Sequence, residues 1–311
     1  HMYKRSSLLL GLLLISCVAF ADIPQIGVDP VPNMTGTTLT ETTIYDAANQ
    51  VYDYSYTLNV PSSATGKIEE VRMDMMAPPN YFPSSVGFPL SIPYGAAGAL
   101  PFNRILNLAG APILPHHNTI IYFGEKLPSN WMGDIDADGN GTFSALTDSV
   151  EVGPGQTASG FIIQSPGQPT IKDVQLVPDW ILDEGDSDLT PSQLEQAGGI
   201  ADQLIIHVPA LGPSPYFPLS EDQWTQFQAD VNKAIQLGWI ADSKFANAVV
   251  SELTAARTEF EAQGPTHISA KLTTLQKTIA SANSSQLNQN AYELLSMNVA
   301  AMIAQVPAPG G

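Results

Sequence analysis

The chain has 311 residues, with 30 acidic side chains against 12 basic ones and a single cysteine, Cys17. Its formal net charge of −18 makes nucleic acid and anionic membrane surfaces poor partners, whereas cations are attracted. The length is sufficient for one large domain or two ordinary ones, each with its own hydrophobic core.

Residues 1–21 have the features of a secretory signal peptide. Two basic residues, Lys4 and Arg5, precede an apolar run at 8–15 that is too short to span a bilayer. An Ala-Phe-Ala motif directly before Asp22 fits a signal peptidase site. We therefore expect a secreted, extracellular-surface or periplasmic protein whose mature chain begins at Asp22 and has no membrane span.

The same segment allows a second interpretation. Leu14-Ile15-Ser16-Cys17 has the form of a lipobox, so lipid anchoring at Cys17 is the alternative to soluble export. Cleavage before Asp22 removes the one cysteine, and the mature chain then cannot form a disulfide bond. Its stability must come from its core, from bound metal or from partners.

Residues 22–212 have the pattern of an antiparallel β-sandwich. Apolar and polar residues alternate over 52–60, a turn follows at 61–66, and a return strand begins at Ile68. Residues 150–164 indicate a hairpin around a Gly-Pro-Gly turn, and 170–177 a further strand. The proline- and glycine-rich stretch at 77–118 is expected to form long loops.

Toward the end of this domain the signals become mixed. Thr190 and Gln193 fit a capping box that starts a helix, and Gly198-Gly199 is expected to end it. A strand is expected over 203–208, followed by a proline-rich connector between Pro209 and Pro218.

Residues 213–306 indicate an antiparallel helical bundle, followed by a disordered tail at 307–311. Four helices are predicted, over 221–237, 243–262, 268–282 and 286–304. Their apolar stripes are typical of a bundle core, here Ile268, Leu272, Leu275 and Ile279 in the third helix and Leu287, Leu294, Leu295, Val299 and Met302 in the fourth. The hydrophobic pattern changes from the two-residue period of strands to the 3.6-residue period of helices, which predicts that this region is a separable unit. The predicted fold class is thus α+β by segments.

Three stretches carry a resemblance to known bacterial proteins. "YDYSYTLNVPSSATGKIEEVRMDM" (52–75) and "VEVGPGQTASGFIIQSPGQPTIKDV" (150–174) resemble hairpins of an exported bacterial β-sandwich domain of uncharacterised function. "ISAKLTTLQKTIASANSSQLNQNAYELL" (268–295) is similar to a helical hairpin appended to bacterial secreted or surface proteins. The resemblance implies an extracellular or surface module and brings no catalytic residues.

The familiar catalytic motifs are missing from the sequence. It has no Gly-x-Ser-x-Gly elbow and no phosphate-binding glycine loop. The His116-His117 pair points to opposite faces if it is extended, and His207 is expected to be a hydrogen-bonded structural residue. Trp131 and Tyr122 flank an acidic segment where they are either core anchors or platforms for sugar rings.

The acidic segment contains the candidate metal site. In "DIDADGNGTF" the positions of a calcium loop are taken, in order, by Asp134, Asp136, Asp138, Gly139, Asn140 and Thr142. Carboxylates two residues apart converge when the chain curls around a hard cation, and glycine permits the sharp turn. Ala145 stands where a helix-loop-helix site has its bidentate glutamate, so we expect a calcium-stabilised loop between strands, completed by Asp148 or a distant acid.

Two function classes follow from the sequence. The favoured one is a non-catalytic secreted or extracellular structural or adhesion module that is stabilised by calcium. Its expected partners are calcium, a second copy of the chain, or an extracellular protein or polysaccharide. The alternative is a secreted carbohydrate-active protein, either a sugar-binding module or a glycoside hydrolase. A deep cleft with two facing carboxylates would favour the hydrolase, whereas exposed apolar patches or open strand edges would favour assembly.

Overall fold

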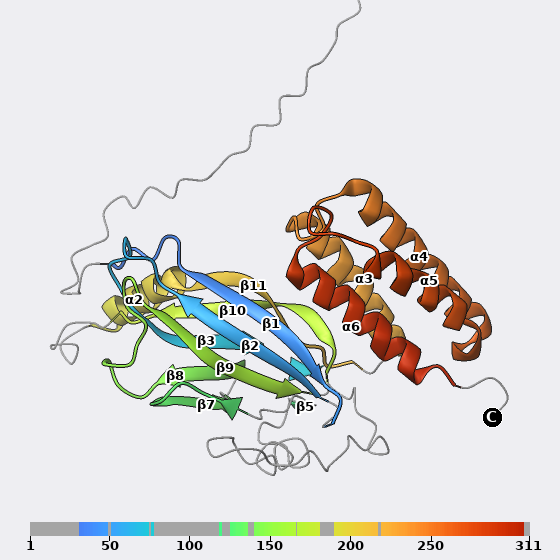
Figure 1. The fold of residues 1–311 in the computed structure, drawn as a ribbon. Coiled ribbons are helices and arrows are strands. Elements are labelled where there is room, and N and C mark those ends of the chain that lie inside the picture. The colour runs from blue at the N-terminus through green and yellow to red at the C-terminus, as the bar shows by residue number, and fades with distance from the viewer. Residues whose placement is uncertain are drawn as a thin grey trace, which may run out of the picture.

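The computed structural model describes residues 31–48, 51–74, 76–77, 118–119, 125–135, 140–165, 167–180, 190–216 and 219–307. Within these ranges the chain forms two antiparallel sheets, a short two-stranded pair and five α-helices, so the fold is mixed α+β (Figure 1). The predicted signal peptide, the lipobox at Cys17 and most of the loops expected over 77–118 lie outside the described residues. In the part of the chain that is described, no helix is long and apolar enough to cross a membrane.

The first sheet has the strand order β1-β2-β9-β6, and every neighbouring pair is antiparallel. Its strands are β1 (Thr38–Asp46), β2 (Val51–Asn59), β9 (Thr157–Ser165) and β6 (Glu125–Lys126). The alternation predicted over 52–60 is confirmed, because Tyr54, Tyr56 and Leu58 are buried while the residues between them are partly exposed. One face of this sheet is therefore an aromatic and aliphatic core surface.

The second sheet has the strand order β11-β10-β3-β8-β7 and is also antiparallel throughout. Its strands are β11 (Ile206–Pro213), β10 (Pro169–Pro178), β3 (Ile68–Asp74), β8 (Asn140–Ala145) and β7 (Trp131–Ile135). A two-stranded pair is formed by β4 (Met76–Ala77) and β5 (Asn118–Thr119).

Two hairpins predicted from the sequence are wrong. The turn at 61–66 does not return β3 to β2, since β3 pairs with β10 and β8 and the turn carries the chain to the second sheet. The segment before β9 pairs through Val152 with Ile68, and β9 pairs with β2 and β6. Period-2 alternation specifies which face of a strand is buried, but it does not identify the neighbouring strand.

Side chains of the two sheets meet in a common core. The Tyr56 hydroxyl donates to the carbonyl of Leu211 at 2.7 Å, which links β2 to β11. Trp131 of β7 packs edge-to-face on Phe161 of β9, with ring centroids 4.8 Å apart. The Tyr54 hydroxyl likewise donates to the carbonyl of Gly167 at 2.6 Å, so both fully buried tyrosines satisfy their hydroxyl groups, as the cost of burying an unpaired polar group requires.

Helix α2 (Pro191–Leu204) begins where the sequence predicts but ends later. Thr190 and Gln193 form the predicted capping box. The helix nevertheless continues through Gly198 and Gly199, where the expected helix end is wrong. Glycine disfavours a helix interior by only about 1 kcal/mol relative to alanine, and the next five residues continue the helix. Strand β11 then starts at Ile206 and includes Pro209, so part of the expected connector belongs to the second sheet.

The four C-terminal helices follow the predicted pattern closely. They are α3 (Glu221–Gln236), α4 (Ser243–Gln263), α5 (Ser269–Ala280) and α6 (Gln289–Gln305), with a 3₁₀ turn, η2 (Pro265–His267), after α4. Ser220 caps α3, and Gly264 ends α4 with a positive φ of 81°, a conformation that favours glycine. All nine predicted stripe residues are buried, with 5% exposure or less, including Ile268 and Leu287, which lie just before α5 and α6.

Buried polar contacts join these helices to the sheets, and we call this set of contacts the seam. In Figure 1, α6 and α3 lie on the side of the helical region that is nearest to the sheets. Asn298 of α6 donates to the carbonyl of Pro169 at 2.7 Å and accepts from the Gln223 amide at 2.7 Å. Asp230 of α3 accepts from the Thr170 hydroxyl at 2.6 Å. Apolar residues of both regions also belong to one continuous buried cluster. Helices and sheets thus share a buried boundary, and the separability of the helical region stays a prediction.

The seam predicts a large cost for losing Asn298. Replacement Asn298→Ala leaves the Pro169 carbonyl and the Gln223 amide buried without a partner, which we expect to cost about 2–4 kcal/mol of unfolding free energy. Urea denaturation should show the loss as one shifted transition. Asn247→Ala on the exposed face of α4 is the matched control and should change stability by less than about 0.5 kcal/mol. If the Asn298→Ala protein were as stable as the control, the buried polar contacts of the seam would not contribute to stability as proposed.

Candidate functional site

The predicted calcium loop includes the end of β7, the start of β8 and the residues that connect them. Asp134 lies opposite Thr142 in the ladder, and Ile135 lies opposite Gly141, so the positions expected to begin and end the loop are cross-strand neighbours. Asp136, Asp138 and Gly139 lie outside the described residues, as do the side chains of Asp134 and Asn140.

Thr142 is the one predicted ligand whose side chain is described. It is 8% exposed, and its hydroxyl makes no hydrogen bond with the described residues. The register places Thr142 and Asp134, which were predicted to share a cation, at one position of the ladder. Asp148, the expected additional ligand, lies in the segment after β8, and its carbonyl accepts from the Lys67 ammonium at 3.1 Å.

A second acidic group, which sequence reasoning missed, lies at the other end of β3. Glu69, Glu151 and Asp179 each place a carboxylate oxygen within 4.8 Å of the others. Three separate segments bring them together. Glu69 is in β3, the Ile68–Val152 bridge holds Glu151 beside it, and the Asp179 amide donates to the carbonyl of Lys67 at 2.9 Å. We call these three residues the acidic cluster.

The charge of the acidic cluster is only partly balanced. Lys67 pairs with Glu151 at 3.2 Å, and Arg72, which pairs with Glu70, also acts on Glu69 with its positive charge. Two cationic side chains thus face the three carboxylates of the cluster and the adjacent Glu70. Burial, together with the nearby charge of Asp179, raises the pKa of Glu69 to about 7. Burial also raises the pKa of Glu151, against the opposing effect of Lys67. A divalent cation would neutralise this excess, and carboxylate oxygens are the ligands that calcium prefers.

No local spacing in the sequence indicates the acidic cluster. Its residues come from "KIEEV", "VEVG" and "VPDW", and each is ordinary in its own segment. Only the pairing of β3 with β10 and the Ile68–Val152 bridge make them neighbours, and the predicted hairpins contained neither pairing.

The other residues singled out from the sequence have structural roles or lie elsewhere. Trp131 is 6% exposed and donates through Nε1 to the carbonyl of Val150 at 3.1 Å, so it is a core anchor and not a sugar platform. His207 is hydrogen-bonded, as expected, through Nδ1 to Asp173 at 2.7 Å, but it is exposed on the second sheet. Tyr122 and the His116-His117 pair lie outside the described residues.

A pair of buried glutamates lies where α6 meets β1. Glu293 of α6 is 3% exposed and accepts from the backbone amide of Thr43 at 2.7 Å. Glu41 of β1 is 6% exposed and accepts from the hydroxyl of the same Thr43. Burial, and secondarily the charge of Glu293, raises the pKa of Glu41 to about 8, so its carboxyl group is mainly protonated at neutral pH.

Comparisons with known proteins add no relative: no protein-family model, no curated protein and no solved structure matches the chain. The function must therefore be inferred from the geometry of the chain itself.

The buried carboxyl groups predict that the protein loses stability as the pH rises. Folding raises the pKa of Glu41 from 4.5 to about 8, so the unfolded chain releases this proton first. The contribution of Glu41 is complete below about pH 4.5 and is lost as the pH approaches 8, and it is on the order of 4 kcal/mol. Asp230, whose pKa burial raises to about 6, acts in the same direction.

Urea denaturation at pH 5 and pH 8 measures this effect. Glu41→Gln, which cannot ionise and can still accept from Thr43, should be more stable than the wild type at pH 8 and should reduce the difference between the two pH values. Glu195→Gln on the exposed face of α2 is the control and should keep the wild-type difference. An equal pH dependence in the wild type and Glu41→Gln would show that Glu41 is not the responsible group.

The acidic cluster predicts calcium binding that weakens in acid. We expect a dissociation constant on the order of 10⁻⁴–10⁻³ M, as in extracellular modules. Affinity should be higher at pH 8 than at pH 6, because the cation competes with the proton on Glu69, whose pKa is about 7. Isothermal titration calorimetry of the wild type, Glu69→Gln and Asp136→Ala assigns the heat to the acidic cluster or to the β7–β8 turn.

Glu70→Gln is the matched control, since Glu70 is adjacent in sequence but pairs with Arg72 outside the acidic cluster. Binding at the acidic cluster is refuted if Glu69→Gln and Glu70→Gln bind calcium as the wild type does. Unchanged binding by Asp136→Ala would in the same way exclude the predicted loop.

Proposed function

We propose that the protein is a non-catalytic, exported structural or adhesion module in which a β-sandwich and a helical bundle form one rigid, calcium-stabilised body. The sandwich interpretation is supported by the contacts of Tyr56 and Trp131 between the two sheets, and the bundle interpretation by the buried stripes of α3 to α6. Export is supported by the signal-peptide features of residues 1–21.

The observation that carries the proposal is the link between the first strand and the last helix. Glu293 of α6 accepts from the backbone of Thr43 in β1, and Asn298 of the same helix holds the start of β10 through Pro169. The two ends of the described chain are thereby fixed to the same core. A protein that leaves the cell without a cysteine needs such an alternative to disulfide bonds. A fixed relative position of sheets and helices is what a structural or adhesive module requires.

Calcium has two supported positions in this proposal. The acidic cluster has three carboxylates beside Lys67 and Arg72, with Glu70 adding a further negative charge, and the segment after β7 has the three closely spaced aspartates of the predicted loop. The remaining negative charge of the chain keeps it soluble and attracts cations.

Self-association is supported by the edge of the first sheet. Strand β1 is the outermost strand of its sheet. Glu293 of α6 covers its edge at Thr43, and beyond this point two of its residues, Ile44 and Tyr45, are 61% and 47% exposed. Exposed apolar residues on an edge strand favour pairing with another chain. A second copy of the protein is therefore the partner that this surface fits best.

Sedimentation of the chain from Asp22 onward tests the proposed assembly. We expect a concentration-dependent increase in mass that Ile44→Asp weakens, because the substitution places a charge on the edge strand. Leu146→Asp, at a residue that is 54% exposed after β8, is the matched control and should assemble normally. A wild type that stays monomeric at every concentration, or assembly that Ile44→Asp leaves unchanged, would overturn self-association through β1.

A further inference from the structure

Two buried glutamates, Glu41 of β1 and Glu293 of α6, bind the same residue on the edge of β1, and we call them the glutamate pair. Glu293 accepts from the backbone amide of Thr43 at 2.7 Å, and Glu41 accepts from the hydroxyl of the same threonine. The two carboxyl groups therefore lie on either side of one residue, although they come from the first strand and the last helix.

The glutamate pair has no counter-ion among the described residues. Glu41 and Glu293 are 6% and 3% exposed, and neither forms an ion pair with a described lysine, arginine or histidine. Two carboxylates in a buried site disfavour each other's charge, and burial disfavours both charges. One member of the pair therefore carries a proton in the packed structure.

The hydrogen bonds indicate which member is charged. Glu293 accepts from two N–H donors, the backbone of Thr43 at 2.7 Å and the Gln289 amide at 2.6 Å, and such donors stabilise a carboxylate. Glu41 has one carboxyl oxygen, Oε2, without a hydrogen-bond partner among the described residues. The proton thus belongs on Glu41.

The strands that pack against Glu41 add no positive charge. Tyr54 and Tyr56 of β2 face it, and burial, together with the charge of Glu41, raises the pKa of both tyrosines. From β11, Glu41 receives only the backbone amide of Leu211. These neighbours offer hydrogen-bonding groups, but they cannot compensate a second negative charge.

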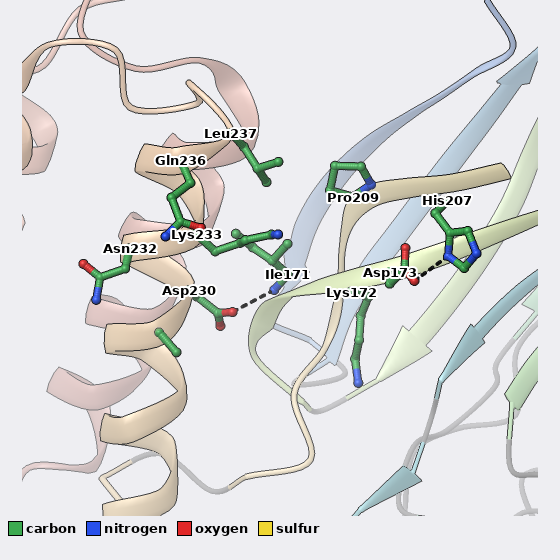
Figure 2. Close-up of a pocket in the computed structure, with 11 residues that line it drawn as sticks. Ile171, Lys172, Asp173, His207, Pro209, Asp230, Asn232, Lys233, Gln236 and Leu237 are labelled. Carbon is green, nitrogen blue, oxygen red and sulfur yellow. Dashed lines mark hydrogen bonds and ion pairs between the residues drawn. The ribbon is translucent and has the colours of Figure 1, made fainter. Parts of the chain in front are cut away.

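The neighbouring contact between α3 and β10 has charges of its own. Figure 2 shows Asp230 of α3, whose carboxylate accepts from the backbone amide of Ile171 at 3.3 Å. Burial lowers the pKa of Lys172 on β10, and the charges of Asp74 and Asp230 oppose this effect. Lys172 therefore offsets these two acids, and the charges that act on the glutamate pair include no described cation.

We propose that the glutamate pair is a pH-sensitive contact: while its two carboxyl groups share one proton, α6 closes the edge of β1, and loss of that proton releases Thr43. Further along α6, Asn298 holds the helix to the carbonyl of Pro169, so the opening is confined to the contact with β1. This device lies outside the proposed structural role, because it operates within one chain whether or not copies associate.

The contact is closed in acid and opens as the pH rises. Folding raises the pKa of Glu41 from 4.5 to about 8, chiefly through burial, so the closed form keeps its proton up to about pH 8. An open, hydrated form has already lost it above about pH 4.5. Between pH 5.5 and pH 8.5 the equilibrium constant for opening should therefore rise on the order of 100-fold.

Hydrogen exchange of the Thr43 amide, followed by NMR in the chain from Asp22 onward, tests the contact. After correction for the intrinsic pH dependence of exchange, its protection should fall on the order of 100-fold between pH 5.5 and pH 8.5, with little response to low urea. Tyr54, directly opposite Thr43 and paired on its other side with Ile163, is the internal control. Its amide should open at a higher free energy and respond to urea.

Glu41→Gln cannot ionise and can still accept from Thr43, so the protection of the Thr43 amide should become nearly independent of pH. Glu195→Gln, on the exposed face of α2, is the control and should keep the wild-type decrease. The proposal is overturned if the wild-type protection does not change with pH or if Glu41→Gln shows the same decrease. It is also overturned if Thr43 opens with the free energy and urea dependence of Tyr54, since the opening would then be global.

Discussion

The structure depends on the buried polar seam between the helices and the two sheets. Asn298, fully buried, bridges the Pro169 carbonyl and the Gln223 amide, while Asp230 and Glu293 receive donors from β10 and β1. Leaving any one of these groups buried without its partner would cost about 1–3 kcal/mol, a substantial part of the stability of a typical domain. The seam therefore specifies a single position for the helices, which apolar packing alone would define less sharply.

This arrangement places acidic groups in environments that disfavour their charge. Glu41, Asp230 and Glu69 all have pKa values raised chiefly by burial, and they lie at three separate contacts between elements. Their protonation state is thus linked to the packing of β1, α3 and β3 respectively. In a chain with 30 acidic residues, protons and cations act on the same groups, and the two kinds of ligand compete at the acidic cluster.

Local features of this fold could be predicted from the sequence, and long-range ones could not. The caps at Thr190 and Ser220 and the stripes of α5 and α6 were predicted correctly, because each is defined by residues within a few turns. The neighbours of β3 and β9 were not, since alternation does not determine pairing.

The same limit explains the candidate sites. The acidic cluster depends on the pairing of β3 with β10 and on the Ile68–Val152 bridge, so it leaves no motif in the sequence. The predicted calcium loop, by contrast, is a contiguous motif, and most of its ligands lie outside the described residues.

Amide hydrogen exchange under native conditions tests the central claim, that sheets and helices form one cooperative body. Tyr54 of β2 and Leu295 of α6 lie in the same buried cluster, so we expect the amides around them to be among the slowest to exchange. If sheets and helices unfold together, both sets exchange with the same free energy of opening and respond equally to urea, as amides exposed only by global unfolding do. If α6 opened at a distinctly lower free energy than β2, the helices would be an independent unit and the account would be contradicted.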